Sequence, residues 1–260
     1  MARLTIPDIA GCWFAFRGDQ ACLAESVQAF RRVYGQNVPI CVFDDRDDPM
    51  EIDFVTTLRP TLYVLTSWER KGNLNGQECV LGILECMALA GSTTGARWIA
   101  KTDCDTIIFK SWANLQASAM FQGIYWWPRA LATGCNYVMS REAPERLRSW
   151  LLVRETMTAS AKWAEDTTIS FYAAVVFPQE VIIRHDGATA NRRIAGGWGY
   201  RPDVTFEIFR DYSVANFGDR HRLPDDWTPD RKRAEVAATM ARFNDWVSEE
   251  FPRMNGGAFA

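Results

Sequence analysis

Short apolar runs alternate with segments of helical periodicity through the first hundred residues, and this alternation restricts the fold more than any other feature. Continuous apolar strands separated by helices are typical of a mainly parallel sheet with helices on both faces. The predicted strands are residues 11–16, 38–43, 61–66 and a segment around Trp98. The first helix is predicted from residues that recur on one helix face: Leu23, Val27, Phe30 and Tyr34.

Capping residues predict where several helices begin and end. Asp19 can cap the first helix, and Gly35 would stop it. Asn75 can cap a second helix, which we expect Gly91 to close. Pro229, between Thr228 and Asp230, predicts the start of a C-terminal helix. The packing face of that helix is expected to consist of Val236, Met240, Phe243 and Val247.

The second half of the sequence is less regular. Residues 134–140 predict a strand, and residues 141–152 predict a helix. Residues 163–168 open another helix, whose first turn contains Glu165 and Asp166. Acidic residues at that place complement the helix dipole. Residues 187–199 are rich in Gly, Arg and Asn, which indicates a loop that can act as a lid.

Polar clusters follow three of the predicted strands. Arg17 follows the first strand, and an acidic run that begins at Asp44 follows the second. Asp103 and Asp105 follow the fourth. Ligands of parallel sheets bind beyond the carboxyl ends of the strands. We therefore expect the three clusters to converge on one edge of the sheet.

The segment from Asp103 to Asp105 favours a divalent cation. Residues one apart in an extended chain point the same way, so both carboxylates would face one site while Cys104 points into the core. Carboxylate oxygens suit Mg²⁺ or Mn²⁺, and such an ion would neutralise a diphosphate. The bare pattern is weak, because it occurs again at Asp45 and Asp47, and a solvated turn is the alternative.

Composition and missing motifs exclude several function classes. A net charge of -3 over 260 residues provides no basic field for binding nucleic acid. No glycine-rich dinucleotide fingerprint follows the first strand, and the sequence contains neither a P-loop nor a Gly-x-Ser-x-Gly nucleophile motif. The only two histidines, His185 and His221, leave few bases for a serine or cysteine nucleophile.

The sequence predicts a cytoplasmic protein. It contains 7 cysteines without a Cys-x-x-Cys pair, and we expect reduced, buried thiols. No signal-peptide pattern is present, and no stretch reaches the ~20 apolar residues that a membrane helix needs. Basic residues at 231–233 leave peripheral membrane contact open, although a solvated helix face is the simpler explanation.

The order of these motifs resembles that of nucleotide-sugar glycosyltransferases of the GT-A fold, over residues 10–225. The first strand and turn precede a helix and a strand that ends at Asp44. A loop at residues 70–76 precedes a helix, as donor-binding loops do in that fold. Residues 101–106, with sequence Lys-Thr-Asp-Cys-Asp-Thr, are similar to the metal-binding DxD segment.

Two later motifs resemble those of inverting β-1,3-galactosyltransferase-type enzymes and their bacterial relatives. Residues 134–141 are similar to the acceptor-side strand, and Glu165 with Asp166 is similar to the downstream Glu-Asp motif. The resemblance implies an α/β, Rossmann-like domain of GT-A type, with a mainly parallel central sheet, helices on both faces and a C-terminal helical extension. Its expected parts are a nucleotide-binding half (1–110), an acceptor-side half (111–225) and a C-terminal helix (226–252).

The activity that the resemblance implies is metal-dependent transfer of a sugar from a nucleotide-sugar, with UDP-sugar favoured, to a hydroxyl acceptor. Inversion is expected, and a retaining transfer, which needs a different arrangement of residues, stays open. Asp105 would bind Mn²⁺ or Mg²⁺ directly, and Asp103 would bind the ribose or reach the metal through water. Asp44 would bind the nucleobase or ribose. Further donor contacts are expected from Arg17, Lys71 and Asn73.

Asp166 is the candidate general base, and Glu165 is its neighbour and a candidate acceptor ligand. Capping of the helix is an equally weighted explanation for both acids. The resemblance also implies a late histidine as a further metal ligand. His221 lies close to the expected position, which Asn216 can also occupy, and His185 is the rival.

Two other functions stay open. A sugar-nucleotidyltransferase also uses a parallel sheet, a metal and nucleotide contacts, but it has a glycine-rich basic loop after the first strand, for which residues 17–19 are a poor substitute. A non-catalytic glycan- or nucleotide-binding protein fits because acid pairs also occur as ordinary surface residues. For a transferase, the acceptor is a glycan, a lipid-linked glycan or a small molecule.

Overall fold

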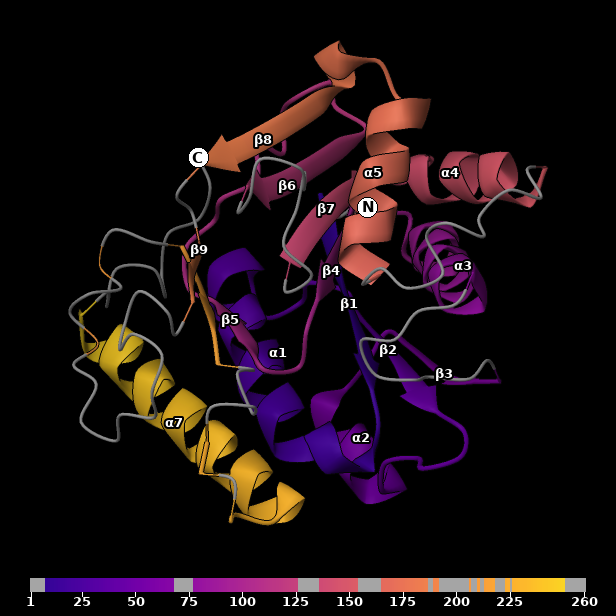
Figure 1. Ribbon diagram of the computed structural model, residues 1–260. Coiled ribbons are helices and arrows are strands. Elements are labelled where there is room, and N and C mark those ends of the chain that lie inside the picture. The colour runs from indigo at the N-terminus through magenta and orange to yellow at the C-terminus, as the bar shows by residue number, and fades with distance from the viewer. Residues whose placement is uncertain are drawn as a thin grey trace, which may run out of the picture.

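A seven-stranded sheet forms the centre of the computed structural model, with strand order β3-β2-β1-β4-β7-β6-β8 (Figure 1). The strands are β1 (Ile9–Ala15), β2 (Ile40–Asp45), β3 (Leu62–Thr66), β4 (Trp98–Thr102), β6 (Phe121–Tyr125), β7 (Asn136–Ser140) and β8 (Ile182–Asp186). The structure describes residues 8–67, 77–125, 136–153, 165–186, 189–191, 206, 210, 213–217, 223–224 and 226–250.

The sheet is mainly parallel, as the apolar runs predict. The neighbours β3, β2, β1 and β4 all run parallel, and so do β6 and β8. Strand β7 is the exception, because it runs antiparallel to both β4 and β6. Every residue of β1 and β4 is buried, which explains why these strands are continuously apolar rather than alternating.

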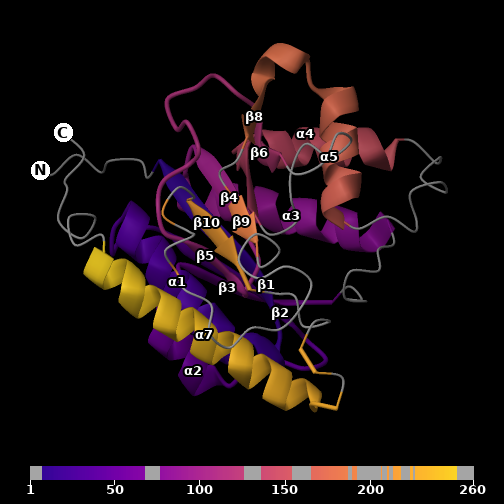
Figure 2. The same cartoon turned by 60° about the vertical axis from the view of Figure 1, so that its left-hand side comes forward.

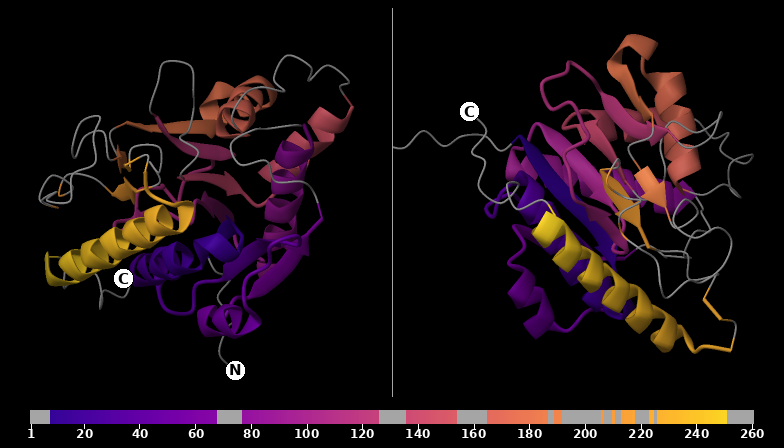
Figure 3. Two further views of the ribbon diagram at one scale, coloured as in Figure 1. Left: turned by 60° about the horizontal axis from the view of Figure 1, so that its bottom comes forward. Right: turned by 90° about the vertical axis from the view of Figure 1, so that its left-hand side faces the viewer.

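Helices cover both faces of this sheet, as expected. One face packs against α1 (Gln20–Tyr34) and α2 (Ile52–Leu58), and the core on this side continues to α7 (Pro229–Glu250). The other packs against α3 (Gln77–Thr94), α4 (Ala143–Leu152) and α5 (Glu165–Val176). Figure 2 shows α7 lying along the outside of α1, and Figure 3 shows the same pair from two further sides.

The predicted helix boundaries are partly right. Helix α7 begins at Pro229, and the backbone N–H of Arg231 donates to the Thr228 hydroxyl at 3.2 Å, as a capping residue allows. The prediction that Gly91 closes α3 is wrong, because the helix continues to Thr94. Gly91 instead permits close packing, since a Cβ there would lie 2.9 Å from the Cγ of Arg141.

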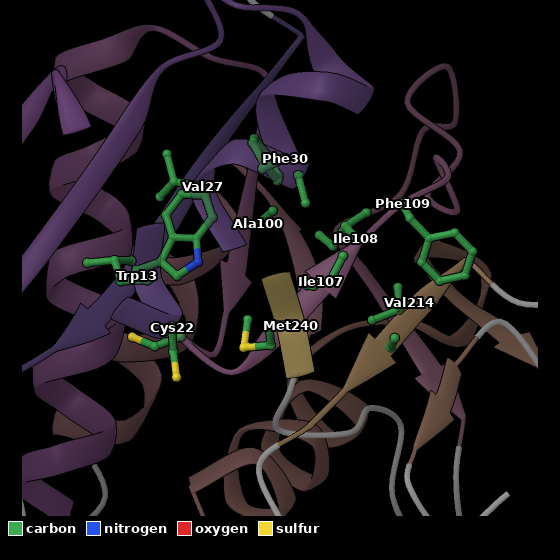
Figure 4. Close-up of a cluster of buried hydrophobic side chains, with 14 of the residues drawn as sticks. Trp13, Cys22, Val27, Phe30, Ala100, Ile107, Ile108, Phe109, Val214 and Met240 are labelled. Carbon is green, nitrogen blue, oxygen red and sulfur yellow. The ribbon is translucent and has the colours of Figure 1, made fainter. Parts of the chain in front are cut away.

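A smaller, three-stranded sheet lies beside the central one. It contains β5 (Thr106–Ile108), β10 (Val214–Asn216) and β9 (Thr189–Asn191) in that order. The strand β9 falls inside the loop predicted for residues 187–199, so that prediction is wrong for residues 189–191. Figure 4 shows the core that joins this sheet to α1, β1, β4 and α7.

The packing face predicted for α7 is confirmed, because Val236, Met240, Phe243 and Val247 all have no exposed surface. The cysteines that the structure describes are buried and free of disulfides, as expected: Cys12, Cys22, Cys41, Cys79, Cys86 and Cys104. Cys135 lies outside the described residues. Within the described part of the chain, no helix combines the length and apolar character needed to cross a bilayer.

Candidate active site

The acidic segment after β4 forms a turn. Strand β4 ends at Thr102 and β5 begins at Thr106, whose backbone N–H donates to the Asp103 carbonyl at 3.1 Å. The extended geometry expected for residues 103–105 is therefore wrong, because the chain leaves the central sheet here to enter the smaller one. Cys104 is 5% exposed and belongs to the core, as expected.

The Asp103 carboxylate pairs with a buried lysine that also contacts Glu165. The Lys101 ammonium lies 2.5 Å from Asp103 Oδ1 and 3.3 Å from Glu165 Oε1. The Tyr137 hydroxyl lies 3.3 Å from the same Glu165 oxygen, to which it donates. Lys101 is only 4% exposed, and its ammonium lies 5.8 Å from the Tyr137 ring centroid. The turn after β4 is thus joined to the first residue of α5.

The antiparallel pairing of β4 with β7 brings this group together. Lys101 is the register partner of Tyr137, so the two residues are neighbours across the strands. The Asn136 amide N–H₂ donates to the Lys101 carbonyl at 2.9 Å and to Thr102 Oγ1 at 2.8 Å. Among the described residues, its buried Oδ1 atom has no hydrogen-bond partner. The start of β7 therefore holds the end of β4.

The Asp105 carboxylate lies beside Asn216. The Asn216 amide nitrogen is 3.3 Å from Asp105 Oδ1 and 2.8 Å from Thr106 Oγ1. The backbone N–H of Phe217 donates to the Asp105 carbonyl at 2.9 Å. Antiparallel pairing of β10 with β5, which places Asn216 opposite Thr106, produces this arrangement. Of the candidates for the further ligand, Asn216 is brought to the Asp105 carboxylate.

Of the two histidines considered as metal ligands, the structure describes only His185. His185 lies on β8, where its Nε2 is 3.0 Å from Gln122 Oε1. Its ring also meets the Trp112 ring edge to face, with centroids 5.1 Å apart. His185 therefore has a hydrogen-bonding partner on β6 of the central sheet and a packing partner in the segment between β5 and β6. His221 lies outside the described residues.

Asp44 is fully buried at the end of β2. Its Oδ2 atom accepts hydrogen bonds from the Met50 backbone N–H at 2.8 Å and from the Tyr63 hydroxyl at 2.6 Å. Its Oδ1 atom is buried and has no hydrogen-bond partner in the described part of the chain. Burial and then the Asp44 carboxylate raise the pKa of Tyr63, so this phenol keeps its proton. Asp44 thus fastens the loop that follows β2.

Arg17 lines a cavity of about 430 Å³ between the starts of α1 and α7. Its Nε atom donates to the Pro49 carbonyl at 3.1 Å and lies 3.6 Å from an Asp48 carboxylate oxygen. Arg233 of α7 lines the same cavity, whereas no described residue of the turn at 103–105 does. The sequence placed Arg17 at the correct strand end, but its side chain belongs to this separate cavity.

Several predicted site residues cannot be placed. Lys71 and Asn73 lie outside the described residues, as does His221. Asp166 lies in the first turn of α5, next to Glu165, and its side chain is outside the described part. The structure therefore brings together Asp103 with Glu165, and Asp105 with Asn216.

Lys101 and Asn136 are the residues of this site to which sequence reasoning assigned no role. A signal for Lys101 was present, because a lysine follows Ile99 and Ala100 in an otherwise apolar strand. A lysine is rarely buried unless it is paired, so its position in a buried strand predicts an acidic partner. The identity of that partner depends on the tertiary structure.

The side chains at this edge fit a hard divalent cation. Among the described residues, no three His, Cys, Asp or Glu side chains form a metal-binding group. Mg²⁺, however, is commonly held by one or two carboxylates together with substrate phosphates and water. The carboxylates of Asp103 and Asp105 and the side-chain oxygen of Asn216 are groups of that chemistry. They suit an ion that binds with a diphosphate better than one held by protein ligands alone.

Comparison with known proteins identifies the fold. No protein-family model and no curated protein matches the sequence. A solved glycosyltransferase involved in glycosylation of the major capsid of PBCV-1 is similar over 91% of this chain and 100% of its own, with TM-score 0.54 and 12% identity. An active-site mutant of LgtC is similar over 90% of this chain and 99% of its own, with TM-score 0.51 and 8% identity. Together with the strand order and the helices on both faces, these likenesses show that the chain has a GT-A-type fold.

Proposed function

We propose that the protein is a metal-dependent glycosyltransferase that moves a sugar from a UDP-sugar to a hydroxyl acceptor with inversion. The fold supports this proposal, and so does the likeness to a glycosyltransferase structure. The observation that carries it is the position of the Asp103–Asp105 turn. This turn lies at the carboxyl edge of the sheet, where Lys101 joins it to Glu165 at the start of α5.

The donor side of the site consists of acids near the end of β4. Asp105 and Asn216 would hold Mn²⁺ or Mg²⁺, with Asp103 at the ribose or bound to the ion through water. The ion would supply Lewis-acid stabilisation of the diphosphate leaving group. Lys71 and Asn73 are the remaining proposed donor contacts. Arg17 and Asp44 stay predictions from the resemblance, because Arg17 lines a separate cavity and Asp44 is buried against Met50 and Tyr63.

The acceptor side begins at α5. In the proposed reaction the acceptor hydroxyl oxygen bonds to the anomeric carbon while the bond from that carbon to the phosphate oxygen breaks. The hydroxyl proton passes to a carboxylate, and the nucleoside diphosphate leaves with the bonding electrons. Asp166 is the proposed base. Glu165 is assigned to acceptor binding and positioning, because Lys101 and Tyr137 both engage one of its oxygens.

The acceptor is proposed to be a glycan, a lipid-linked glycan or a small molecule. The described residues contain no helix suited to crossing a membrane. The cytoplasmic location stays a prediction. Because the net charge is -3, nucleic acid is not proposed as a partner.

Calorimetric titration with UDP, with and without Mn²⁺, tests the proposal. We expect Mn²⁺-dependent binding of UDP that is stronger than binding of GDP or CDP and is lost in Asp105→Ala. The matched control is Asp47→Ala, because Asp47 belongs to the second Asp-x-Asp pattern and is exposed on the turn after β2. Equal loss of binding in both variants, or unchanged binding in Asp105→Ala, would refute the site.

Turnover then separates the transferase from the two other functions. A transferase consumes UDP-sugar and releases UDP. A nucleotidyltransferase instead joins a sugar phosphate to a nucleoside triphosphate and releases pyrophosphate. A binding protein retains nucleotide affinity and shows neither reaction.

A further inference from the structure

A buried lysine joins the two halves of the proposed site. Lys101 lies at the end of β4, in the half proposed to bind the donor, and is 4% exposed. Its ammonium lies 2.5 Å from Asp103 Oδ1 and 3.3 Å from Glu165 Oε1. One carboxylate belongs to the turn proposed to bind the donor. The other belongs to the helix that carries the proposed base.

The chemistry of burial makes this arrangement specific. A buried ammonium is unfavourable unless opposite charges and hydrogen bonds compensate it. Asp103 and Glu165 supply the opposite charges, and Tyr137 donates to the same Glu165 oxygen. Removing Lys101 would leave two partly buried carboxylates close together without the cation between them, and they would repel each other.

The backbone around Lys101 is itself held in place. Asn136 donates to the Lys101 carbonyl and to the Thr102 hydroxyl, so the end of β4 is fastened to β7. Lys101 therefore projects its ammonium from a rigid strand, whereas the first turn of α5 lies at a helix end. A cation on a rigid element can set the position of a helix end that contacts it.

We propose that Lys101 is a positioning residue that sets the distance between the donor-side turn and the first turn of α5. This inference rests on the proposed function for its consequence in catalysis, but the contact itself does not depend on that function. Misplacement of a reacting group by about 1 Å can lower turnover roughly 100-fold. Loss of Lys101 should therefore affect turnover more than donor binding.

The test compares Lys101→Met with Arg148→Met, which removes a cation paired with Glu85 at 3.4 Å on the outer surface. Hydrogen–deuterium exchange at the amides of residues 169–172, whose helical hydrogen bonds to the carbonyls of residues 165–168 close the first turn of α5, is measured without any ligand and reports opening of that turn. We expect exchange there to rise about 10-fold or more in Lys101→Met, with α7 unchanged, since only the local opening equilibrium is altered. The Arg148→Met control should exchange like the wild type.

Kinetics then test the consequence. In Lys101→Met we expect turnover to fall about 10-fold or more while UDP affinity stays within about 3-fold of wild type. In the double variant Lys101→Met with Glu165→Gln, the loss of turnover should exceed the larger single-variant loss by no more than about 3-fold. The reason is that both substitutions remove the same contact between Lys101 and Glu165. If Lys101→Met does not fold, Glu165→Gln carries the exchange measurement, since it leaves Lys101 paired with Asp103.

The outcomes separate this inference from the proposed function. If a folded Lys101→Met variant exchanges at α5 like the wild type, the positioning role is refuted, whatever its turnover is. Where Glu165→Gln carries the measurement instead, unchanged exchange in that variant refutes the role in the same way. If UDP affinity and turnover fall together in equal measure, the residue acts in binding and the role is again refuted. If wild-type protein transfers no sugar but exchange rises as expected, the proposed function fails while the contact is supported.

Discussion

Phe243 of α7 offers a demanding test of how the helix supports the site. Its ring has no exposed surface and lies against three phenylalanine rings, with centroids 5.2 Å from Phe109, 5.2 Å from Phe206 and 5.4 Å from Phe217. Phe217 follows Asn216, whose amide contacts the Asp105 carboxylate. Truncating Phe243 to alanine should therefore loosen both the core and this edge of the proposed site.

The expected loss is large compared with the stability of an ordinary domain. Replacing a buried phenylalanine by alanine typically lowers the free energy of unfolding by about 3–5 kcal/mol. Aromatic pairs contribute about 0.5–1.5 kcal/mol beyond the buried area, which places Phe243→Ala near the upper end of that range, at about 4–5 kcal/mol. For a chain of this size, a loss of that magnitude lowers the melting temperature by roughly 7–10 °C.

Urea denaturation followed by circular dichroism measures this change. The free energy of unfolding should fall while the dependence on urea stays constant, because the surface exposed on unfolding is nearly the same. Glu249→Ala is the control, since Glu249 is exposed on the same helix, and it should change stability by less than about 0.5 kcal/mol. A loss below about 2 kcal/mol in Phe243→Ala would refute the reasoning.

Three further changes test separate features. Asp166→Asn should lower sugar-transfer turnover by about 100-fold or more with UDP affinity nearly unchanged, and loss of binding by calorimetry would contradict its role as a base. Gly11→Ala would place a Cβ 2.4 Å from a Trp13 ring carbon, so urea denaturation should show a loss of about 1–3 kcal/mol from overpacking. Burial raises the pKa of Tyr34 to about 12, and a hydrogen bond with Ser111 opposes that shift only in part. Because the folded state binds this proton more tightly than the unfolded state, the protonated phenol stabilises the fold fully below about pH 10, and this stabilisation is lost as the pH rises through about 12. The urea midpoint of the wild type should therefore fall over this range. Tyr34→Phe should abolish that part of the fall.

Local patterns predicted much of the fold. The apolar run that contains Trp13 is a strand because burial on both faces requires apolar side chains at successive positions. Thr228 and Pro229 mark the start of α7 because a proline fits the first helical turn. The prediction at Gly91 failed for a local reason, because α3 continues to Thr94 and the glycine that follows its last residue with a positive φ of 69° is Gly95.

The candidate site was predicted less completely. The sequence identified Asp103, Asp105 and Glu165 as acids of interest, but it gave no means to pair them. Lys101 joins Asp103 to Glu165 only because β7 runs antiparallel beside β4 and positions Tyr137 next to the lysine. The expected extended geometry of residues 103–105 failed because the chain turns there into the smaller sheet.

The sequence by itself located strands β1 to β4 and β7, helices α1, α3, α4, α5 and α7, and the strand ends that carry polar residues, because these depend on side chains that are close along the chain. Only the tertiary structure decided which polar residues meet. Asp105 and Asn216 are 111 residues apart in sequence and become neighbours through the pairing of two three-residue strands. Such short strands have too little local pattern to be recognised, so their contacts follow from packing against the rest of the core.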